Sequence, residues 1–496
     1  MTDKKSTVVV IGGGLGGLSA AVSLRQEGYQ VTVVEKNQHL GGKVNRLESA
    51  GFGFDLGPSI LTMPQIFEAL FTKSHRQMKD YVAIRRLPLE WRSFFPDGTK
   101  IDLYGDLSRM ARENPVLKAK DMEEYRTFLA YAKEIYDLTA EGYFAEGFDQ
   151  TKDVLRHHGI IKALKGFDYF STMQEAIDQR VSNPKLQEML GYFSKYVGSS
   201  PYDAPAVLNM MSYMQHTQGI WYVPGGMHRL AEGIVQLAEE IGVTFITGQQ
   251  VTKLDTQDQR ITRAHLADGC TLTADIFVSN MEVIPAYQQL LTEEISPKAE
   301  KKFEPASSGF VLHLGVKADY PQLAHHNFFF SGAAQKNFDQ NFHDHQLPED
   351  PTIYLVNVNK TDPSQTKPGH ENIKILPHIP YLQDTPFTEV QYTAFRKRIL
   401  EKLERMGLTD LQKNIVFEDR WTPADIEANY LSHRGAIYGT VSDRKRNHGF
   451  KHPKHSERYG NLYFVGGTVN PGAGMPMVTL SGQQVSRMIA QNKQFV

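Results

Sequence analysis

Apolar positions near the N-terminus predict a parallel βαβ unit. VVVI (8–11) has the length of a short buried strand, residues 17–28 have the spacing of an amphipathic helix, and VTVVE (31–35) predicts a second strand. A glycine-rich turn separates the first strand from the helix, which ends at Gly28. This arrangement is typical of the start of a nucleotide-type α/β domain.

Downstream, helical and strand patterns alternate. Residues 85–104 predict a hairpin turned at Asp97-Gly98, 106–216 read as mostly helical, and 223–243 predict a turn followed by a helix. Further strands are predicted at 274–281, 308–317 and 351–380, a helix at 388–406, and a strand, glycine loop and helix over 461–482. We therefore predict a discontinuous cofactor domain (1–84, 217–290, 416–496) with inserted substrate-domain segments (85–216, with the helical segment, and 291–415).

Length and composition narrow the possibilities. A chain of 496 residues exceeds what one core normally organises, so two or more domains are expected. The net charge of −2 gives no argument for a nucleic-acid partner. The single cysteine, Cys270, excludes an internal disulfide and fits a reducing compartment. We expect it to be a small buried hydrophobe.

The sequence predicts a cytoplasmic protein. The N-terminal apolar run breaks into glycines after four residues, unlike a signal peptide, and nowhere are there 18 consecutive apolar residues. Peripheral association with the membrane remains open. The basic run 443–455 is either a solvated loop or a contact with anionic lipid headgroups.

The turn after the first strand carries a dinucleotide fingerprint. Gly12 allows the tight turn, Gly14 lets the backbone approach a pyrophosphate, and Gly17 lets helix and strand pack closely. The helix N-terminus offers N–H donors to phosphates. Glu35, at the end of the second strand, can accept hydrogen bonds from ribose hydroxyls. Both FAD and NAD would fit this pattern.

A second signal favours FAD. Glu35 is followed at short range by Gly41-Gly42 and Lys43, and Gly57-Pro58 offers another close backbone approach. This arrangement resembles the FAD-dependent amine oxidase and phytoene desaturase superfamily, which implies a Rossmann-like FAD-binding domain with an inserted mixed α+β substrate domain and a helical segment. The predicted cofactor-binding residues are Gly12, Gly14, Gly17, Glu35, Lys36, Gly42, Lys43, Gly57, Pro58, Ser59, Val251, Gly467, Met475, Met477 and Val478.

The resemblance also explains the glycine loop near the C-terminus. In that superfamily the last strand, loop and helix return to the first βαβ unit, where a helix N-terminus stabilises negative charge on the reduced flavin. Related desaturases carry Thr-His-Pro where this chain has Val469-Asn470-Pro471, which puts simple desaturation in doubt. Thr468 and Asn470 are the candidate catalytic residues, by their predicted proximity to the flavin alone.

Long strings such as GFGFDLGPSILTMP and GGTVNPGAGMPMVTLSGQQV resemble carotenoid oxidoreductases of this superfamily over the whole chain. The resemblance implies FAD-dependent oxidation of the terminal methyl group of a thirty-carbon acyclic carotenoid to an aldehyde, with other carotenoid-pathway enzymes as possible partners. Either water or dioxygen could supply the oxygen. Three alternatives stay open: a desaturase acting on dehydrosqualene or phytoene, an FAD amine oxidase, and a carotenoid carrier without flavin.

Two clusters allow more than one interpretation. Met210, Met211, Met214, Trp221 and Tyr222 suit an irregular apolar channel but equally a helix core. The aromatic strand 325–330 has the same ambiguity, and His325 and His326 point to opposite faces of it, so we predict no metal site.

Overall fold

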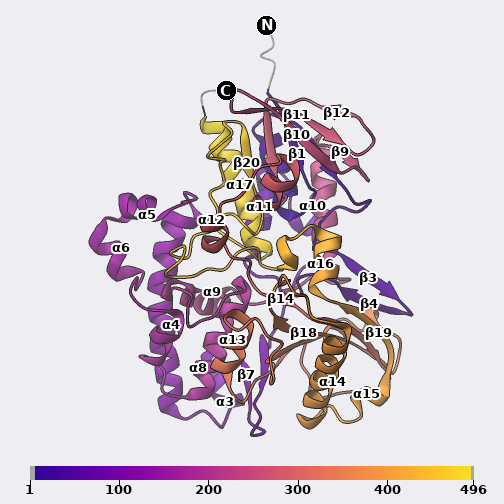
Figure 1. Ribbon diagram of the computed structural model, residues 1–496. Coiled ribbons are helices and arrows are strands. Elements are labelled where there is room, and N and C mark those ends of the chain that lie inside the picture. Colours follow the sequence, from indigo (N-terminus) through magenta and orange to yellow (C-terminus); the bar gives the residue numbers. More distant parts are fainter. Residues whose placement is uncertain (1–5, 493–496) are drawn as a thin grey trace.

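The computed structural model describes residues 6–492. The prediction about a signal peptide rests partly on residues 1–5, which lie outside the described residues, as do 493–496. A parallel sheet with its helices occupies the upper part of Figure 1, and a larger sheet with further helices occupies the lower part.

The parallel sheet is assembled from distant segments of the chain. Its order is β20-β13-β1-β2-β9, with Val10 paired to Val33 on one side and to Val278 on the other. The strands are β1 (Thr7–Ile11), β2 (Gln30–Glu35), β9 (Thr244–Thr247), β13 (Ile276–Ser279) and β20 (Leu462–Phe464). The sequence pattern had indicated this discontinuous sheet, although the domain boundaries themselves stay a prediction.

Both faces of this sheet are buried, as expected for parallel strands. Val8 and Val10 pack in the core with α1 (Leu15–Gln26), α10 (His228–Glu240) and α17 (Met475–Gln491). Val9 and Ile11 pack against a small sheet of β10 (Val251–Gln257), β11 (Arg260–Leu266) and β12 (Thr271–Leu272).

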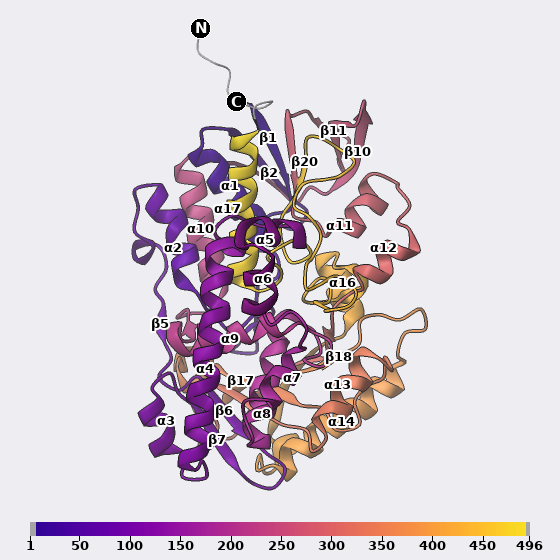
Figure 2. The same ribbon diagram turned by 90° about the vertical axis from the view of Figure 1, so that its left-hand side faces the viewer.

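The C-terminal helix lies directly against the first helix. A Cβ at Gly482 of α17 would lie 2.5 Å from the Ala20 nitrogen and 2.7 Å from the Gly16 oxygen of α1. The Ser19 hydroxyl also donates to the Thr479 carbonyl at 2.6 Å. The predicted return of the tail to the first βαβ unit is therefore confirmed, and α1 and α17 are seen side by side in Figure 2.

The larger sheet is mostly antiparallel and has two different faces. Ile373, Ile375 and Ile379 of β18 pack on α14 (Glu389–Arg405), whereas Lys374, Leu376 and His378 face a cavity. The order is β19-β15-β18-β17-β16-β6-β7, with β14 beside β18. The bounds are β6 (Trp91–Phe94), β7 (Lys100–Leu103), β14 (Ser308–Gly309), β15 (Val311–Val316), β16 (His326–Phe329), β17 (Ile353–Asn357), β18 (Glu371–Ile379) and β19 (Ile415–Trp421). The predicted hairpin at Asp97-Gly98 joins β6 to β7.

The predicted helical segment is confirmed. It contains α3 (Leu107–Glu113), α4 (Ala119–Thr139), α5 (Thr151–His158), α6 (Ile160–Gly166), α7 (Met173–Asp178), α8 (Pro184–Gly191) and α9 (Met210–Gln218). In Figure 1, α5 and α6 stand out at the left-hand side. Of the helices described within residues 6–492, none is long and apolar enough to cross a membrane.

The remaining elements connect these parts. They are α2 (Pro64–Lys73), α11 (Val283–Pro285), α12 (Pro297–Lys302), α13 (Ala334–Phe342), α15 (Leu411–Asn414), α16 (Pro423–Tyr430), β3 (Arg46–Ser49), β4 (Phe52–Asp55), β5 (Arg85–Arg86) and β8 (Trp221–Tyr222).

One expectation was wrong, and another holds only in part. Cys270 is exposed, because the turn that joins β11 to β12 carries it away from the core. The basic run 443–455 is not simply a solvated loop, because Lys451 and Lys454 are 2% and 0% exposed.

Candidate active site

Glycines pack the first turn against a second loop. Gly12 has φ +96° and its N–H donates to the Val34 carbonyl at 2.8 Å. A Cβ at Gly14 would lie 2.7 Å from Asn280 Nδ2, and one at Gly42 would lie 3.0 Å from the Gly14 Cα. A Cβ at Gly17 would lie 2.1 Å from the Gly12 oxygen. Only bare backbone therefore fits at this turn, and it can approach a ligand closely.

Glu35 is buried at the carboxyl end of β2, and its carboxylate organises the turn. Its Oε2 accepts from the Gly13 N–H at 2.8 Å, and its Oε1 accepts from the Asn37 N–H at 2.9 Å. A carboxylate has about four lone-pair positions, so Glu35 can still accept hydrogen bonds from the hydroxyl groups of a ribose. Lys36 donates to the Asn429 carbonyl at 2.7 Å, and Lys43 Nζ lies 3.6 Å from Glu282 Oε1.

Asn280 links the two glycine turns and was missed from the sequence. It follows β13, and its Oδ1 accepts from the Gly17 N–H at 3.0 Å. A Cβ at Gly466 would lie 3.3 Å from the same oxygen, so the C-terminal loop meets the first turn here. A polar residue at the carboxyl end of a buried parallel strand was the available signal.

These elements enclose a cleft of about 330 Å³, within the range of roughly 300–1,000 Å³ typical of small-molecule sites. Most of the predicted cofactor residues line it: Gly12, Gly14, Glu35, Lys36, Gly42, Lys43, Gly57, Pro58, Val251, Gly467, Met475 and Val478. Gly17 packs under the turn, and Ser59 and Met477 line a neighbouring cavity. The glycine cradle, the terminal carboxylate and the α1 N-terminus are the groups that a flavin dinucleotide requires, so these residues fit it.

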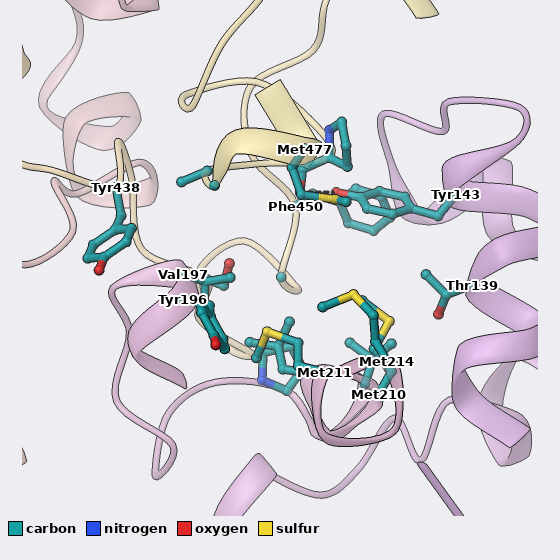
Figure 3. Close-up of a pocket in the computed structure, with 18 of the residues that line it drawn as sticks. Thr139, Tyr143, Tyr196, Val197, Met210, Met211, Met214, Tyr438, Phe450 and Met477 are labelled. Carbon is teal, nitrogen blue, oxygen red and sulfur yellow. Dashed lines mark hydrogen bonds between the residues drawn. The ribbon is translucent and has the colours of Figure 1, made fainter. Parts of the chain in front are cut away.

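The neighbouring cavity measures about 390 Å³ and is mainly apolar. Met210, Met211 and Met214 of α9 gather opposite Met477 and Tyr143 in Figure 3. The three methionines therefore line a cavity, whereas Trp221 and Tyr222 are not among its lining residues. Cleft and cavity adjoin, because Gly57, Pro58, Lys374, Leu376, Tyr438, Ala473, Gly474 and Met475 line both.

The N-terminus of α17 lies at this junction. Met475 is its first residue, and Gly474 before it has φ +98° and no side-chain cap. The partial positive charge of a helix N-terminus is thus directed to the place where cleft and cavity meet.

Lys374 also lies at the junction and was missed from the sequence. Its Nζ donates to the Gly57 carbonyl and to Ser59 Oγ, the latter at 3.3 Å. Burial lowers the pKa of Lys374 to about 8, although Asp55 opposes the shift. Burial likewise raises the pKa of Asp55 to about 6, against the effect of Lys374. The available signal was a lysine interrupting the apolar run of β18.

Asn470 and Thr468, the candidate catalytic residues, line neither space. Asn470 Oδ1 accepts from the Tyr143 hydroxyl at 2.7 Å and from the Lys451 N–H at 2.9 Å. Thr468 Oγ1 accepts from the Val283 N–H at 3.3 Å. The geometry supports a positioning role, since Asn470 holds the cavity-lining Tyr143. A catalytic role for either stays a prediction.

His325 and His326 have separate partners. His325 Nδ1 bonds Thr361 Oγ1 and His326 Nδ1 bonds the Tyr354 hydroxyl, both at 2.8 Å. Neither lines the cleft or the cavity. Across residues 6–492 no cluster of three or more His, Cys, Asp or Glu side chains could hold a metal ion.

Comparison with solved structures confirms the predicted fold class. A crystal structure of an oxidoreductase from Methanosarcina mazei matches with TM-score 0.62 and 16% identity, covering 97% of this chain and 100% of that one. Putrescine oxidase bound to putrescine matches with TM-score 0.64 and 13% identity, covering 98% and 99%. At sequence identities this low, the structural similarity shows the fold alone.

Comparison of the sequence with those of named proteins shows the family as well as the fold. This chain is 58% identical over 491 residues to the 4,4'-diaponeurosporene oxygenase of Staphylococcus haemolyticus (strain JCSC1435), covering 99% of this chain and 97% of the relative. It is 59% identical over 485 residues to the enzyme of that name from Staphylococcus aureus (strain USA300), covering 97% of each. The profile of the flavin-containing amine oxidoreductases matches residues 15–490. The chain is therefore an oxidoreductase that belongs to the flavin-containing amine oxidoreductase family.

Proposed function

We propose that this protein is an FAD-dependent enzyme of carotenoid biosynthesis that oxidises the terminal methyl group of 4,4'-diaponeurosporene, a thirty-carbon acyclic carotenoid, to an aldehyde. The relatives' names give the substrate. The observation that carries the proposal is the junction of a methionine-lined apolar cavity with a glycine-lined cleft at the start of α17.

The cleft and the cavity have different roles in the proposed reaction. A bound flavin would supply the redox chemistry, which must remove two electrons twice because a methyl group lies four electrons below an aldehyde. The chain holds the dinucleotide through the Gly12–Gly14 turn, Glu35 and the α1 N-terminus, and it directs the α17 N-terminus at the reacting end. Met210, Met211 and Met214 follow the irregular surface of a polyene, so that one terminal carbon is aligned with the cleft.

Lys374 and Tyr143 are two polar residues in the lining of the mainly apolar cavity. Lys374 is fixed by Gly57 and Ser59, and the Tyr143 hydroxyl is fixed by Asn470. Burial raises the pKa of the Tyr143 hydroxyl well above its usual range, so it remains a neutral donor at physiological pH. We propose that the mainly apolar lining keeps bulk water out of the reacting end, and that these fixed polar groups leave the polyene an apolar path.

The same proposal includes entry of the substrate from a membrane surface. Val154, Leu155 and Phe167 in the α5–α6 region line the cavity, while Ile160 and Ile161 are 64% and 75% exposed. From the basic run, Arg444 and His448 line the cavity, and His448 bonds Tyr169 at 3.1 Å. Exposed apolar and basic side chains therefore lie beside the cavity, as peripheral binding to an anionic bilayer requires.

Product analysis tests the assigned reaction. Purified, flavin-loaded protein is incubated with 4,4'-diaponeurosporene dispersed in detergent. The products are then separated, and their masses are determined by mass spectrometry. We expect a carotenoid aldehyde. A product with longer conjugation and no oxygen would contradict the proposal in favour of a desaturase. Parallel incubations with labelled water and labelled dioxygen, with carbonyl exchange controlled, identify the oxygen source.

A further inference from the structure

The apolar cavity has basic side chains in its lining but no carboxylate. Among the described residues 6–492, none that lines the cavity is Asp or Glu, whereas Lys195, Lys374 and Arg444 all line it. Positive charge in a space with low-dielectric walls attracts an anion. The lining therefore favours a ligand that is apolar along most of its length and anionic at one end.

Two of these three basic side chains are already held by the protein. Lys374 Nζ donates to Ser59 Oγ at 3.3 Å. Lys195 Nζ is enclosed in an aromatic cluster, 3.7 Å from the ring centroid of Phe328. Arg444 is therefore the cation of the lining that remains for a ligand.

Arg444 is partly buried, and its guanidinium group has no protein partner. Its main-chain N–H donates to the Asp203 carbonyl at 2.9 Å, which fixes the backbone. Nε is enclosed without a hydrogen-bond partner. The two terminal nitrogens are not enclosed in this way, and within residues 6–492 they make no hydrogen bond or ion pair. They are free to bind a ligand.

The nearby carboxylates are engaged by other basic residues. Arg446 pairs with Glu304, and its Nε lies 3.5 Å from Asp443 Oδ2. The carboxylate of Asp203 lies 2.9 Å from His343 Nε2. The two arginines of this loop therefore differ, because the second has its counterions in the protein and the first does not.

We propose that Arg444 is a carboxylate-binding site, and that the cavity holds a long-chain carboxylic acid with its head group on this arginine. The inference goes beyond the proposed oxidation, because such binding needs no turnover. A guanidinium group can donate two parallel hydrogen bonds to one carboxylate. The chain of the acid follows Met210, Met211 and Met214, whose thioethers adapt to an irregular hydrocarbon surface.

The cost of burying charge fixes the position of the head group. An ionised carboxylate is stable in an apolar cavity only where it is paired and hydrogen-bonded. Arg444 supplies the charge, and the buried Ser442 places a hydroxyl group in the same lining. A neutral carotenoid needs neither group. Fatty acids and carotenoid acids share the chemistry that this site recognises.

Equilibrium dialysis of radiolabelled oleate against the flavin-loaded protein tests the site, below the critical micelle concentration of oleate. We expect Arg444→Gln to lower the affinity for oleate at least tenfold and to leave that for uncharged methyl oleate unchanged. Lys445→Gln is the matched control. This neighbouring residue is exposed and lines neither space, so the same loss of charge there should leave oleate binding unchanged.

Competition identifies the source of the acid. All-trans-retinoic acid, a polyene acid, and unlabelled oleate are each used to displace the bound label. Displacement by either acid supports the carboxylate site, and the stronger competitor shows whether a carotenoid acid or a fatty acid fits it better.

Two results would overturn the inference. The first is equal affinity of the wild type for oleate and methyl oleate, a comparison that needs no variant. The second is an Arg444→Gln protein that keeps wild-type oleate affinity but no longer co-sediments with phosphatidylglycerol vesicles, because the arginine would then bind the bilayer surface. Oxidation of 4,4'-diaponeurosporene is assayed separately, so failure of the acid site leaves the proposed function untouched.

Discussion

Asn280 is a single side chain in contact with both glycine-lined turns. It accepts from the Gly17 N–H at 3.0 Å and lies beside Gly14 and Gly466. Asn280→Ala removes this hydrogen bond and leaves space under the turn, a loss of about 1 kcal/mol. We expect flavin affinity to fall about fivefold, measured by titrating apoprotein with FAD and following fluorescence quenching.

Asn461 provides the matched control. This buried asparagine accepts from the Ile261 N–H at 2.8 Å at the opposite end of the same sheet, away from the cleft. Asn461→Ala should lower the melting temperature without changing flavin affinity. Equal flavin affinity in the Asn280 variant and wild type would show that the asparagine does not organise the cofactor turn.

Residue types at the site were predictable where backbone geometry dictates them. Gly12, Gly14 and Gly42 recur in a spacing that a close backbone approach requires, and they line the cleft. Asn280 and Lys374 could not be found that way. Lys374 interrupts the apolar pattern of β18 and Asn280 directly follows β13, and the role of each depends on which distant segment packs opposite it.

At the scale of elements, the contact between α1 and α17 sets the shape of the site. Gly482 has no room for a side chain, because its Cβ would meet the backbone of Ala20 and Gly16. Gly482→Ala should push α17 outward and move its N-terminus from the junction. We expect a fall in melting temperature of several degrees, together with reduced flavin content after purification.

Gly460→Ala tests whether that effect is specific to the helix contact. Gly460 lies in the same C-terminal region, and nothing lies within 4 Å of a Cβ placed there. This variant should retain wild-type stability and flavin content. Similar losses in both variants would point to a general sensitivity of the C-terminal segment instead.

The α5–α6 region carries the prediction about membrane contact. Ile160 and Ile161 are 64% and 75% exposed beside the cavity-lining residues of the same helices. The double variant Ile160→Glu/Ile161→Glu should reduce co-sedimentation with anionic phosphatidylglycerol vesicles at least fivefold, because carboxylates are repelled and apolar burial is lost.

Val390 supplies the control for a mere change of surface charge. It is 79% exposed on α14, on a different part of the molecule from α5 and α6. Val390→Glu should leave vesicle binding unchanged. Vesicle binding by the Ile160/Ile161 variant at the wild-type level would remove α5–α6 as the contact surface.

For the whole molecule, sequence patterns predicted the discontinuous parallel sheet and the helical segment, whereas the return of the tail was implied by the resemblance to the amine oxidase and phytoene desaturase superfamily. Short-range periodicity and the positions of glycines are local features, so they can be recognised in the sequence without coordinates. The cavity, in contrast, depends on contacts between segments that are distant in the sequence. It exists because one face of β18 packs on α14 while its other face is left toward α9 and the α5–α6 region. The residue pattern of β18 alone does not indicate which of its two faces is left toward the cavity.

The burial of histidines makes the molecule sensitive to acid. Burial lowers the pKa of His325, His378 and His452 to about 3, and that of His433 to about 4. The unfolded chain, with a usual histidine pKa near 6.5, binds more protons between these values. The contribution of these histidines to stability is therefore complete above about pH 6.5 and falls as the pH drops toward 4.

Buried carboxyl groups act in the opposite direction. Burial raises the pKa of Asp55 to about 6, and that of Glu90 and Glu188 to about 7, so their protonation stabilises the fold on acidification. Lowered lysine pKa values, about 8 for Lys374 and about 7 for Lys451, add stability above those pH values. The pKa shifts of His325, His378 and His452 each exceed every one of these carboxyl shifts, so acid should destabilise the fold overall.

We expect the melting temperature of the flavin-loaded protein to be highest on the alkaline side of neutrality, near pH 8–9, and to fall by roughly ten degrees or more by about pH 4.5. Scanning fluorimetry in buffers of equal ionic strength measures it. His452→Leu removes one buried histidine and should reduce the acid slope, whereas His39→Leu, at an exposed position, should not. A melting temperature that stays level from neutral pH to about pH 4.5 would mean that these histidines accept protons without unfolding, because water reaches their rings in solution.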